Sequence, residues 1–232
     1  MKKVLGILGG MGPQATIDFQ QKVLNLTAAA SDQEHMRVFV DSHPQIPPRT
    51  DAIFGRGENS APAMQESLDK LCQMGAGCIA MPCITAHYFL PQLKVPSGIT
   101  FLNAPQLTAK ACLEKFPGKT VGTLSTSGTA RSHTLIGVLE SNGISYIQPN
   151  GEQQEALDAL IAAVKAKGDM GVITAGFDAI TAEMAARGAQ YFILGCTELP
   201  LIVQAYAFPH AFVDPTTELA REAVGTCGYA ML

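Results

Sequence analysis

The stretch 77–89, "GCIAMPCITAHYF", contains a short apolar run that ends in a proline and then Cys83. The stretch 188–200, "GAQYFILGCTELP", repeats this design and ends its apolar run at Cys196. A short apolar run bounded by turn residues is typical of a strand buried on both faces of a parallel sheet. The sequence therefore predicts two buried strands, each followed at its carboxyl end by a cysteine.

Short apolar segments alternate with amphipathic ones along the whole chain of 232 residues. This order predicts an α/β fold with mostly parallel sheets flanked by helices. The expected strands are 3–10, 36–43, 78–82, 119–126, 144–149 and 189–195. The expected helices are 13–29, 60–75 with Ser60 as its N-cap and Gly75 at its end, 109–118, 130–143, 152–168, 178–188 and 216–225.

The pattern of glycines and cysteines repeats within the chain. "GILGGMG" at 6–12 matches "GTLSTSG" at 122–128, and a Gly-Ala pair precedes each of the two cysteines by the same eight residues. Ligands of open α/β sheets bind at the carboxyl ends of the strands. We therefore expect two pseudo-symmetric halves, with Cys83 and Cys196 facing each other across one cleft.

Composition excludes several classes of protein. The net charge is −4 without a basic run, which argues against nucleic-acid binding, and no apolar stretch approaches the roughly 20 residues that span a membrane. Glycines interrupt the apolar run of the N-terminal "MKKVLGILGGMG", which fits a first strand better than an export signal, so we expect a cytoplasmic protein. The histidines show no metal spacing, and no metal is predicted.

The six cysteines include no CxxC pair, which argues against a zinc ribbon or a thioredoxin-type site. We expect reduced thiols, with core positions for Cys72, Cys78, Cys112 and Cys227. Two thiols on opposite sides of a small molecule suit proton transfer at carbon, because one thiolate removes a proton and the facing thiol returns one. Backbone amides or a helix N-terminus can draw a thiol pKa of about 8.5 toward neutrality.

Five motifs resemble the aspartate/glutamate racemase family, whose members need no cofactor and are related to glutamate and hydantoin racemases. They are "GILGGMGPQAT" at 6–16, "PQIPPRT" at 44–50, "PCITAH" at 82–87, "TLSTSGT" at 123–129 and "LGCTELPL" at 194–201. The resemblance implies a homodimeric racemase of aspartate or glutamate that uses neither pyridoxal phosphate nor metal. With the final helix returning to the first half, the halves are expected at 1–98 plus 210–232 and at 99–209.

The resemblance also implies the roles of individual residues. Cys83 and Cys196 would be the acid–base pair, Arg49 would bind a substrate carboxylate, and Lys165 would bind the distal one. Ile84 stands where the family often has an asparagine, which leaves the substrate open. The remaining residues expected to contact the substrate are Met11, Gln14, Ile84, Thr85, Thr126, Thr129, Thr197 and Glu198.

Several alternatives stay open at this point. Glu198 would hold the substrate's α-ammonium group or cap the next helix, His87 would pack structurally or act as a cation beside Cys83, and Asp214 would cap a helix. A related hydantoin racemase or maleate isomerase activity on another carboxylate is an alternative function. Others are a catalytically silent dicarboxylate-binding protein and a thiol redox switch.

Overall fold

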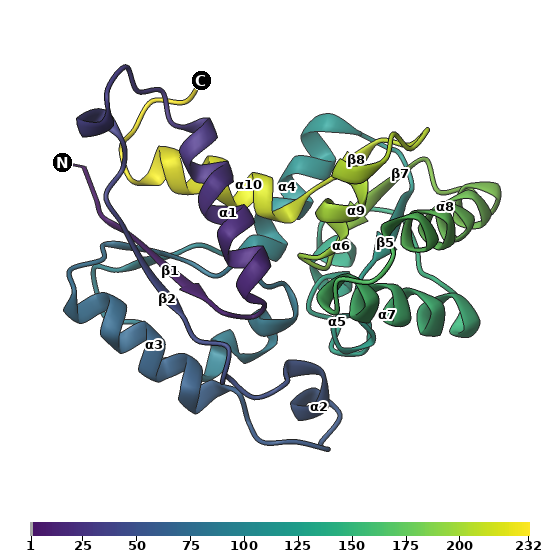
Figure 1. The fold of residues 1–232 in the computed structure, drawn as a ribbon, viewed down its shortest axis with the longest axis horizontal. Helices are drawn as coiled ribbons and strands as arrows, with labels where there is room; N and C mark the ends of the chain where they lie inside the picture. The colour runs from purple at the N-terminus through teal and green to yellow at the C-terminus, as the bar shows by residue number, and fades with distance from the viewer. Residues whose placement is uncertain (1) are drawn as a thin grey trace.

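The computed structural model of the protein describes residues 2–232, which form two lobes (Figure 1). Each lobe contains a four-stranded sheet in which every pairing is parallel, in the orders β2-β1-β3-β4 and β6-β5-β7-β8. The strands are β1 Leu5–Gly9, β2 Val38–Ser42, β3 Cys78–Ala80, β4 Thr100–Phe101, β5 Val121–Leu124, β6 Tyr146–Ile147, β7 Tyr191–Leu194 and β8 Phe212–Val213. The identical order in both sheets confirms the predicted α/β fold of two similar halves.

Helices connect and flank the strands of both sheets. They are α1 Pro13–Leu26, α2 Arg49–Ile53, α3 Ala61–Gln73, α4 Ala104–Lys115, α5 Ser127–Arg131, α6 Ile136–Ser141, α7 Gly151–Lys165, α8 Met170–Ala186, α9 Leu199–Ala205 and α10 Pro215–Thr226. Two 3₁₀ segments, η1 Asp32–Glu34 and η2 Thr85–Gln92, complete the described elements. The short elements β4, β8 and α2 were not predicted from the sequence.

Three local predictions need correction. The single helix expected over 130–143 is two helices, α5 and α6, because His133 adopts the left-handed conformation (φ 53°) and breaks the chain direction. Helix α8 begins well before residue 178, since the Asp169 side chain accepts from the backbone of Gly171 and caps it earlier. Ser60 occupies the predicted N-cap of α3, but its hydroxyl donates to the carbonyl of Pro47 instead of capping the helix.

The repeated glycines have the same packing role in both sheets. Gly6 on β1 pairs with Ile79 on β3, and a Cβ on Gly6 would lie 2.7 Å from the Ile79 side chain. Gly122 on β5 pairs with Phe192 on β7, and a Cβ there would overlap the Phe192 ring. Each central strand thus gives up a side chain so that a large residue of its neighbour can cross it, which explains why the glycine spacing recurs.

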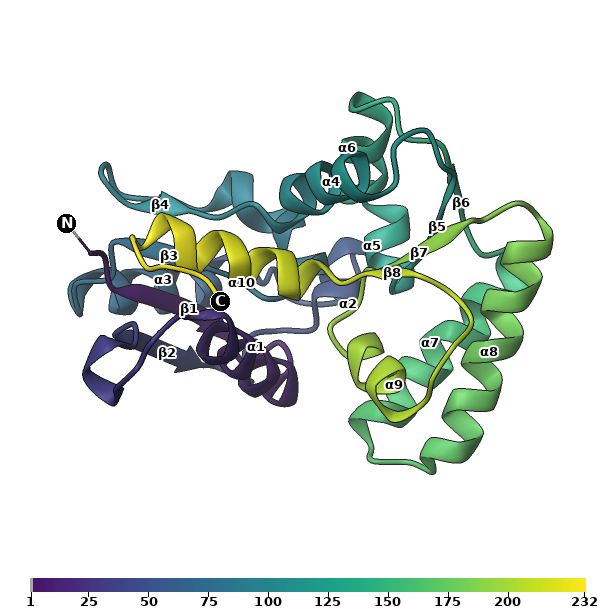
Figure 2. The same cartoon turned by 90° about the horizontal axis from the view of Figure 1, so that it is seen from above.

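The chain crosses between the halves slightly later than expected from the borders at 98 and 210. Strand β4 pairs with β3 in the first sheet, and β8 pairs with β7 in the second sheet. Helix α10 then returns to pack against α1 of the first half, and it also packs against α4, which follows the crossing (Figure 2). The Asp214 side chain accepts from the backbone of Thr216 and caps α10, which confirms its structural assignment.

One buried cluster joins the two halves. It includes Leu5 and Cys78 of the first sheet, Tyr191 of the second, and Leu219 and Cys227 at α10. Separate clusters lie under α3 in the first half and under α7 and α8 in the second. Cys78, Cys112 and Cys227 are buried as predicted, whereas Cys72 is half-buried at the edge of the α3 cluster.

Candidate active site

The two cysteines singled out by the sequence line the same cavity. Cys83 follows strand β3, Cys196 follows strand β7, and their residues are only 8% and 7% exposed. The cavity has a volume of about 120 Å³ and draws its walls from both halves. Its lining residues are Met11, Pro48, Arg49, Thr50, Cys83, Ile84, Thr85, Thr126, Lys165, Gly195, Cys196, Thr197 and Glu198.

Ten of the twelve residues predicted for the site line this cavity. Gln14 does not, because it lies exposed on the first turn of α1. Thr129 is fully buried behind the cavity wall and reaches it only through hydrogen bonds to other threonines. Sequence reasoning missed Pro48, Thr50 and Gly195, although each adjoins a predicted site residue within the motifs 44–50 and 194–201.

Cys196 has a carboxylate as its immediate partner. Its Sγ donates to Oε2 of Glu198 at 3.0 Å, and the Thr197 hydroxyl donates to the same oxygen at 3.2 Å. Burial, and after it the charge of Glu198, raises the pKa of the Cys196 thiol well above its ordinary value. Cys196 is therefore a protonated thiol at neutral pH, although a backbone hydrogen bond from Glu198 acts in the opposite sense and lowers its pKa.

Cys83 is positioned through its backbone by a buried histidine. Nδ1 of His87 lies 2.9 Å from the carbonyl of Cys83, and Nε2 accepts from the backbone N–H of Ala104 at 3.1 Å. Burial lowers the pKa of His87 to about 4, so the ring is neutral and its Nδ1–H donates to Cys83. The structural role favoured for His87 is confirmed, and the alternative role as a cation beside the thiol is wrong.

Two cationic side chains contribute to the cavity walls. Arg49 begins helix α2, and its Nη1 donates to the carbonyls of Ile46 and Pro47, each at 3.0 Å, which fixes the direction of the guanidinium. Lys165 ends helix α7 with its side chain half exposed, and its Nζ lies 3.8 Å from Oε1 of Glu198. The first half thus supplies a cation anchored by two carbonyls, and the second half supplies a half-exposed one.

Threonine hydroxyls tie the two halves together beside the cavity. The hydroxyl of Thr85 lies 2.7 Å from that of Thr129 and 3.1 Å from that of Thr126. Thr126 also accepts from the backbone N–H of Thr129 and so caps helix α5. These contacts hold η2 of the first half against α5 of the second.

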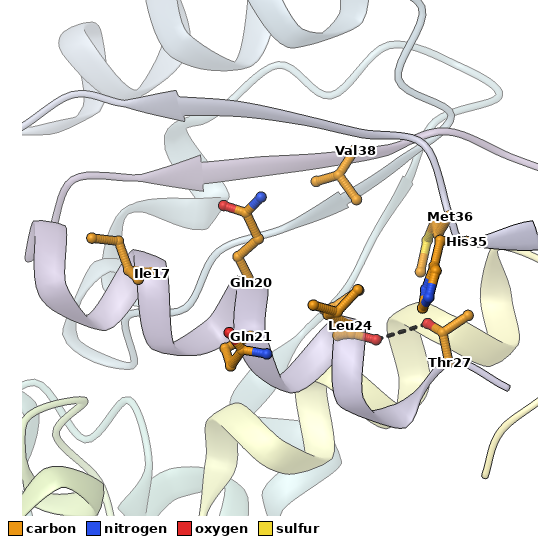
Figure 3. A pocket seen from close by; sticks show the side chains of 9 residues that line it. Ile17, Gln20, Gln21, Leu24, Thr27, His35, Met36 and Val38 are labelled. Atoms are coloured by element: carbon orange, nitrogen blue, oxygen red, sulfur yellow. Dashed lines mark hydrogen bonds between the residues drawn. The ribbon is translucent and has the colours of Figure 1, made fainter. Parts of the chain in front are cut away.

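A second, larger cavity of about 380 Å³ lies between helix α1 and strand β2, away from both cysteines. Ile17, Gln20 and Leu24 project from α1 beside Val38 of β2 (Figure 3). His35 is its one titratable lining residue, so the paired groups needed for acid–base chemistry are lacking there. We therefore place the candidate active site at the cavity that contains the cysteines.

Within residues 2–232, no group of three or more histidine, cysteine, aspartate or glutamate side chains is arranged to hold a metal ion. None of the helices in the same range is both long and apolar enough to cross a membrane.

The fold and this cavity define an α/β protein of two similar halves with a candidate active site between them. Comparison with known proteins agrees, because the model of the Asp/Glu/hydantoin racemase family matches residues 8–223. The chain therefore belongs to the Asp/Glu/hydantoin racemase family and is an isomerase of the racemase class.

Individual relatives cover nearly the whole chain. The broad specificity amino-acid racemase RacX of Bacillus subtilis is 29% identical over 227 residues, which are 96% of this chain and 97% of RacX. The structure of the Picrophilus torridus aspartate racemase superposes with a TM-score of 0.87 at 30% identity, covering 99% of this chain and 96% of that one. A putative Asp/Glu racemase from Yersinia pestis shares the fold, with a TM-score of 0.80 at 23% identity over 97% of this chain and 99% of that one.

Proposed function

We propose that this protein racemises an acidic amino acid, aspartate or glutamate, with Cys83 and Cys196 as its acid–base pair and without a cofactor. The observation that carries the proposal is the position of the two cysteines. They follow equivalent strands of the two halves and line one small cavity together with two cationic side chains. An acid and a base that approach one carbon from opposite sides are what inversion of configuration requires.

In the proposed reaction, one cysteine thiolate removes the α-proton and becomes a thiol. The other cysteine thiol gives its proton to the opposite face of the same carbon and becomes a thiolate. The charge that develops on the substrate between these steps needs preorganised donors. Arg49, Lys165 and the threonine hydroxyls of the cavity wall are suited to this role.

The charge of the cavity supports an acidic substrate. Its ionisable side chains other than the cysteines are Arg49, Lys165 and Glu198, which together carry one net positive charge. A dicarboxylic amino acid carries one net negative charge, whereas a neutral amino acid carries none. Arginine suits a carboxylate because its planar fork donates two parallel hydrogen bonds. The similarity to a protein named aspartate racemase points the same way.

The apolar side chain of Ile84 in the cavity wall favours a second candidate function. Its buried side chain cannot hydrogen-bond to polar groups of a substrate, although the family often carries an asparagine at this position. A wider substrate range, as the name of the Bacillus relative describes for that protein, is compatible with this apolar wall. The alternative substrates are hydantoins and small carboxylates such as maleate.

Proton NMR in D₂O tests the proposal. Each enantiomer of aspartate and glutamate is incubated with wild-type enzyme, and loss of the α-proton signal is followed together with conversion to the other enantiomer. We expect both events in wild type and more than a thousandfold loss of interconversion in Cys83→Ala and in Cys196→Ala. Cys72→Ala is the matched control, because Cys72 lies outside the cavity.

Absence of exchange with all four amino acids would overturn the acidic-substrate proposal. Assays with hydantoins and maleate would then test the second candidate function, and calorimetry with aspartate would identify a silent dicarboxylate-binding protein. Activity that survives dialysis against a chelator and a carbonyl reagent tests the independence from cofactors. Light scattering tests the homodimer, which we infer from the family resemblance.

A further inference from the structure

The two cysteines have different partners although their halves are equivalent. The residue two positions after Cys196 is Glu198, whose side chain faces the thiol. The residue two positions after Cys83 is Thr85, whose hydroxyl instead faces Thr126 and Thr129. A carboxylate therefore accompanies only one of the two thiols, and the pseudo-symmetry of the fold does not extend to the chemistry of the site.

Both oxygens of the Glu198 carboxylate are engaged within the cavity wall. Oε2 accepts from the Cys196 Sγ and from the Thr197 hydroxyl, and Oε1 lies near the Lys165 ammonium. The residue is only 4% exposed, so the carboxylate cannot exchange these partners for bulk water. A carboxylate held in this way is poorly placed to receive the α-ammonium group of a substrate as well.

We propose that Glu198 serves Cys196 rather than the substrate: it takes the thiol proton when Cys196 must become a base, and releases that proton to water once the thiolate has taken the α-proton. Glu198 is then a positioning residue that shares one proton with Cys196, whereas Cys83 works without such a partner. The inference rests on the proposed function, because it assigns the second thiol of that reaction.

The proton count closes in both directions. When Cys83 is the base, it takes the α-proton as a thiolate, and Cys196 gives its own proton to the opposite face. The resulting Cys196 thiolate and the Glu198 carboxylate repel each other, so the pair regains one proton from water, and the Cys83 thiol releases one to water before the next turnover. When Cys196 is the base, its proton moves to Oε2 of Glu198, the thiolate takes the α-proton, and the Cys83 thiol supplies the proton on the other face. Glu198 then releases its proton to water and the Cys83 thiolate takes one up, which restores the starting state.

The charges around the pair make this sharing possible. Burial and the Glu198 charge both raise the pKa of Cys196, while Lys165 opposes them. Arg49 and the Cys83 thiol are the other charged or titratable groups that line the cavity. Removing the negative charge of Glu198 therefore lowers the Cys196 pKa and also removes the acceptor of its proton.

Alkylation with iodoacetamide tests the pairing without any substrate. The rate at each cysteine is read by peptide mass spectrometry as a function of pH in wild type, Glu198→Gln and the charge-matched control Glu183→Gln on the exposed face of α8. We expect Glu198→Gln to move the Cys196 midpoint to lower pH, with a smaller change at Cys83. A Cys196 midpoint that stays at the wild-type pH overturns the inference.

Exchange of the α-proton tests the catalytic consequence. Glu198→Gln is introduced into the Cys83→Ala and Cys196→Ala backgrounds, each of which retains one thiol. We expect the loss of deuterium exchange to be at least tenfold greater in the Cys83→Ala background, where only Cys196 can act. An equal loss in both backgrounds would mean that Glu198 contacts the substrate, and it would overturn the inference.

Two controls keep the outcomes separate. If wild type racemises nothing, the proposed function fails, but the alkylation profile still decides whether Glu198 governs the Cys196 thiol. If Cys83→Ala shows no exchange even with Glu198 intact, the alkylation profile alone decides the inference.

Circular dichroism checks that Glu198→Gln folds. Glu198→Asp, which keeps the charge, should restore part of the wild-type midpoint. A midpoint for Glu198→Asp equal to that of Glu198→Gln would count against the role of the charge.

Discussion

The hydroxyl of Thr85 in the first half lies 2.7 Å from the hydroxyl of Thr129 in the second half, and both side chains are buried. Thr85 begins η2, directly after the Cys83-Ile84 pair, and Thr129 belongs to α5. This contact therefore joins the loop that carries one proposed catalytic cysteine to the opposite half. It connects the stability of the interface with the geometry of the cavity.

Replacing Thr85 by valine should weaken both the stability of the interface between the halves and the racemase activity. The substitution keeps the shape of the side chain but leaves the buried Thr129 hydroxyl with a poorer partner, at a cost of about 1–2 kcal/mol in the free energy of unfolding. We also expect about a tenfold loss of kcat/KM for racemisation, because the Cys83 loop loses its contact across the cavity. Urea unfolding and chiral product analysis measure the two effects. Thr85→Ser, which retains the hydroxyl, should stay close to wild type, and a valine variant as stable as the serine variant would contradict the prediction.

His87 should make the protein sensitive to acid. Its pKa is about 4 in the folded protein because of burial, and about 6.5 in an unfolded chain. The unfolded state therefore binds more protons between these values, so the full stabilisation is present above pH 6.5 and is lost as the pH falls toward 4. The loss amounts to about 3 kcal/mol of unfolding free energy.

Urea unfolding between pH 7.5 and pH 4.5 measures this dependence. His87→Gln should be less stable than wild type at pH 7.5, since the ring links Cys83 to Ala104, but its stability should change less with pH. His133→Gln is the control, because His133 is exposed. A wild-type slope that persists unchanged in His87→Gln would assign the acid sensitivity to other groups.

Gly122 should tolerate a side chain poorly, because the Phe192 ring occupies the space of its Cβ. A methyl group at this position would overlap the Phe192 ring, and we expect Gly122→Ala to lower the unfolding free energy by about 1–3 kcal/mol. Gly137 in α6 is the matched control, since a Cβ there meets no atom within 4 Å. Gly137→Ala should stabilise the protein by about 0.4–1 kcal/mol, because it removes backbone freedom from the unfolded chain. Equal melting temperatures for the two variants would refute this account of the glycine repeat.

Arg49 should bind a substrate carboxylate through the planar fork of its guanidinium group. Arg49→Lys keeps one positive charge but loses the planar fork and the two carbonyl contacts that direct it. We expect about a hundredfold loss of kcat/KM for aspartate or glutamate, since two charge-assisted hydrogen bonds are replaced by one. Arg56→Lys, on the exposed turn after α2, is the control. Steady-state assays that show a loss of less than threefold would remove Arg49 from the carboxylate site.

The sequence predicted the parts of the fold that depend on long, regular patterns. Strands β1 and β7 lie within their expected ranges because four or five consecutive buried residues leave a clear apolar run. The break at His133 escaped prediction, since nothing in the local sequence forbids a continuous helix there. Strands β4 and β8 are two residues long and exist only because a neighbouring strand offers hydrogen-bonding partners.

By itself the sequence determined that two similar α/β halves each end a buried strand in a cysteine, because apolar periodicity and glycine spacing are local properties of the chain. The tertiary structure decided which side chains meet. Only in the folded chain does Gln14 lie outside the cavity lining, His87 become neutral through burial, and Glu198 face Cys196 instead of capping α9. The physical reason is that burial, pKa and hydrogen-bond partners depend on atoms distant in sequence, which residue spacing does not encode.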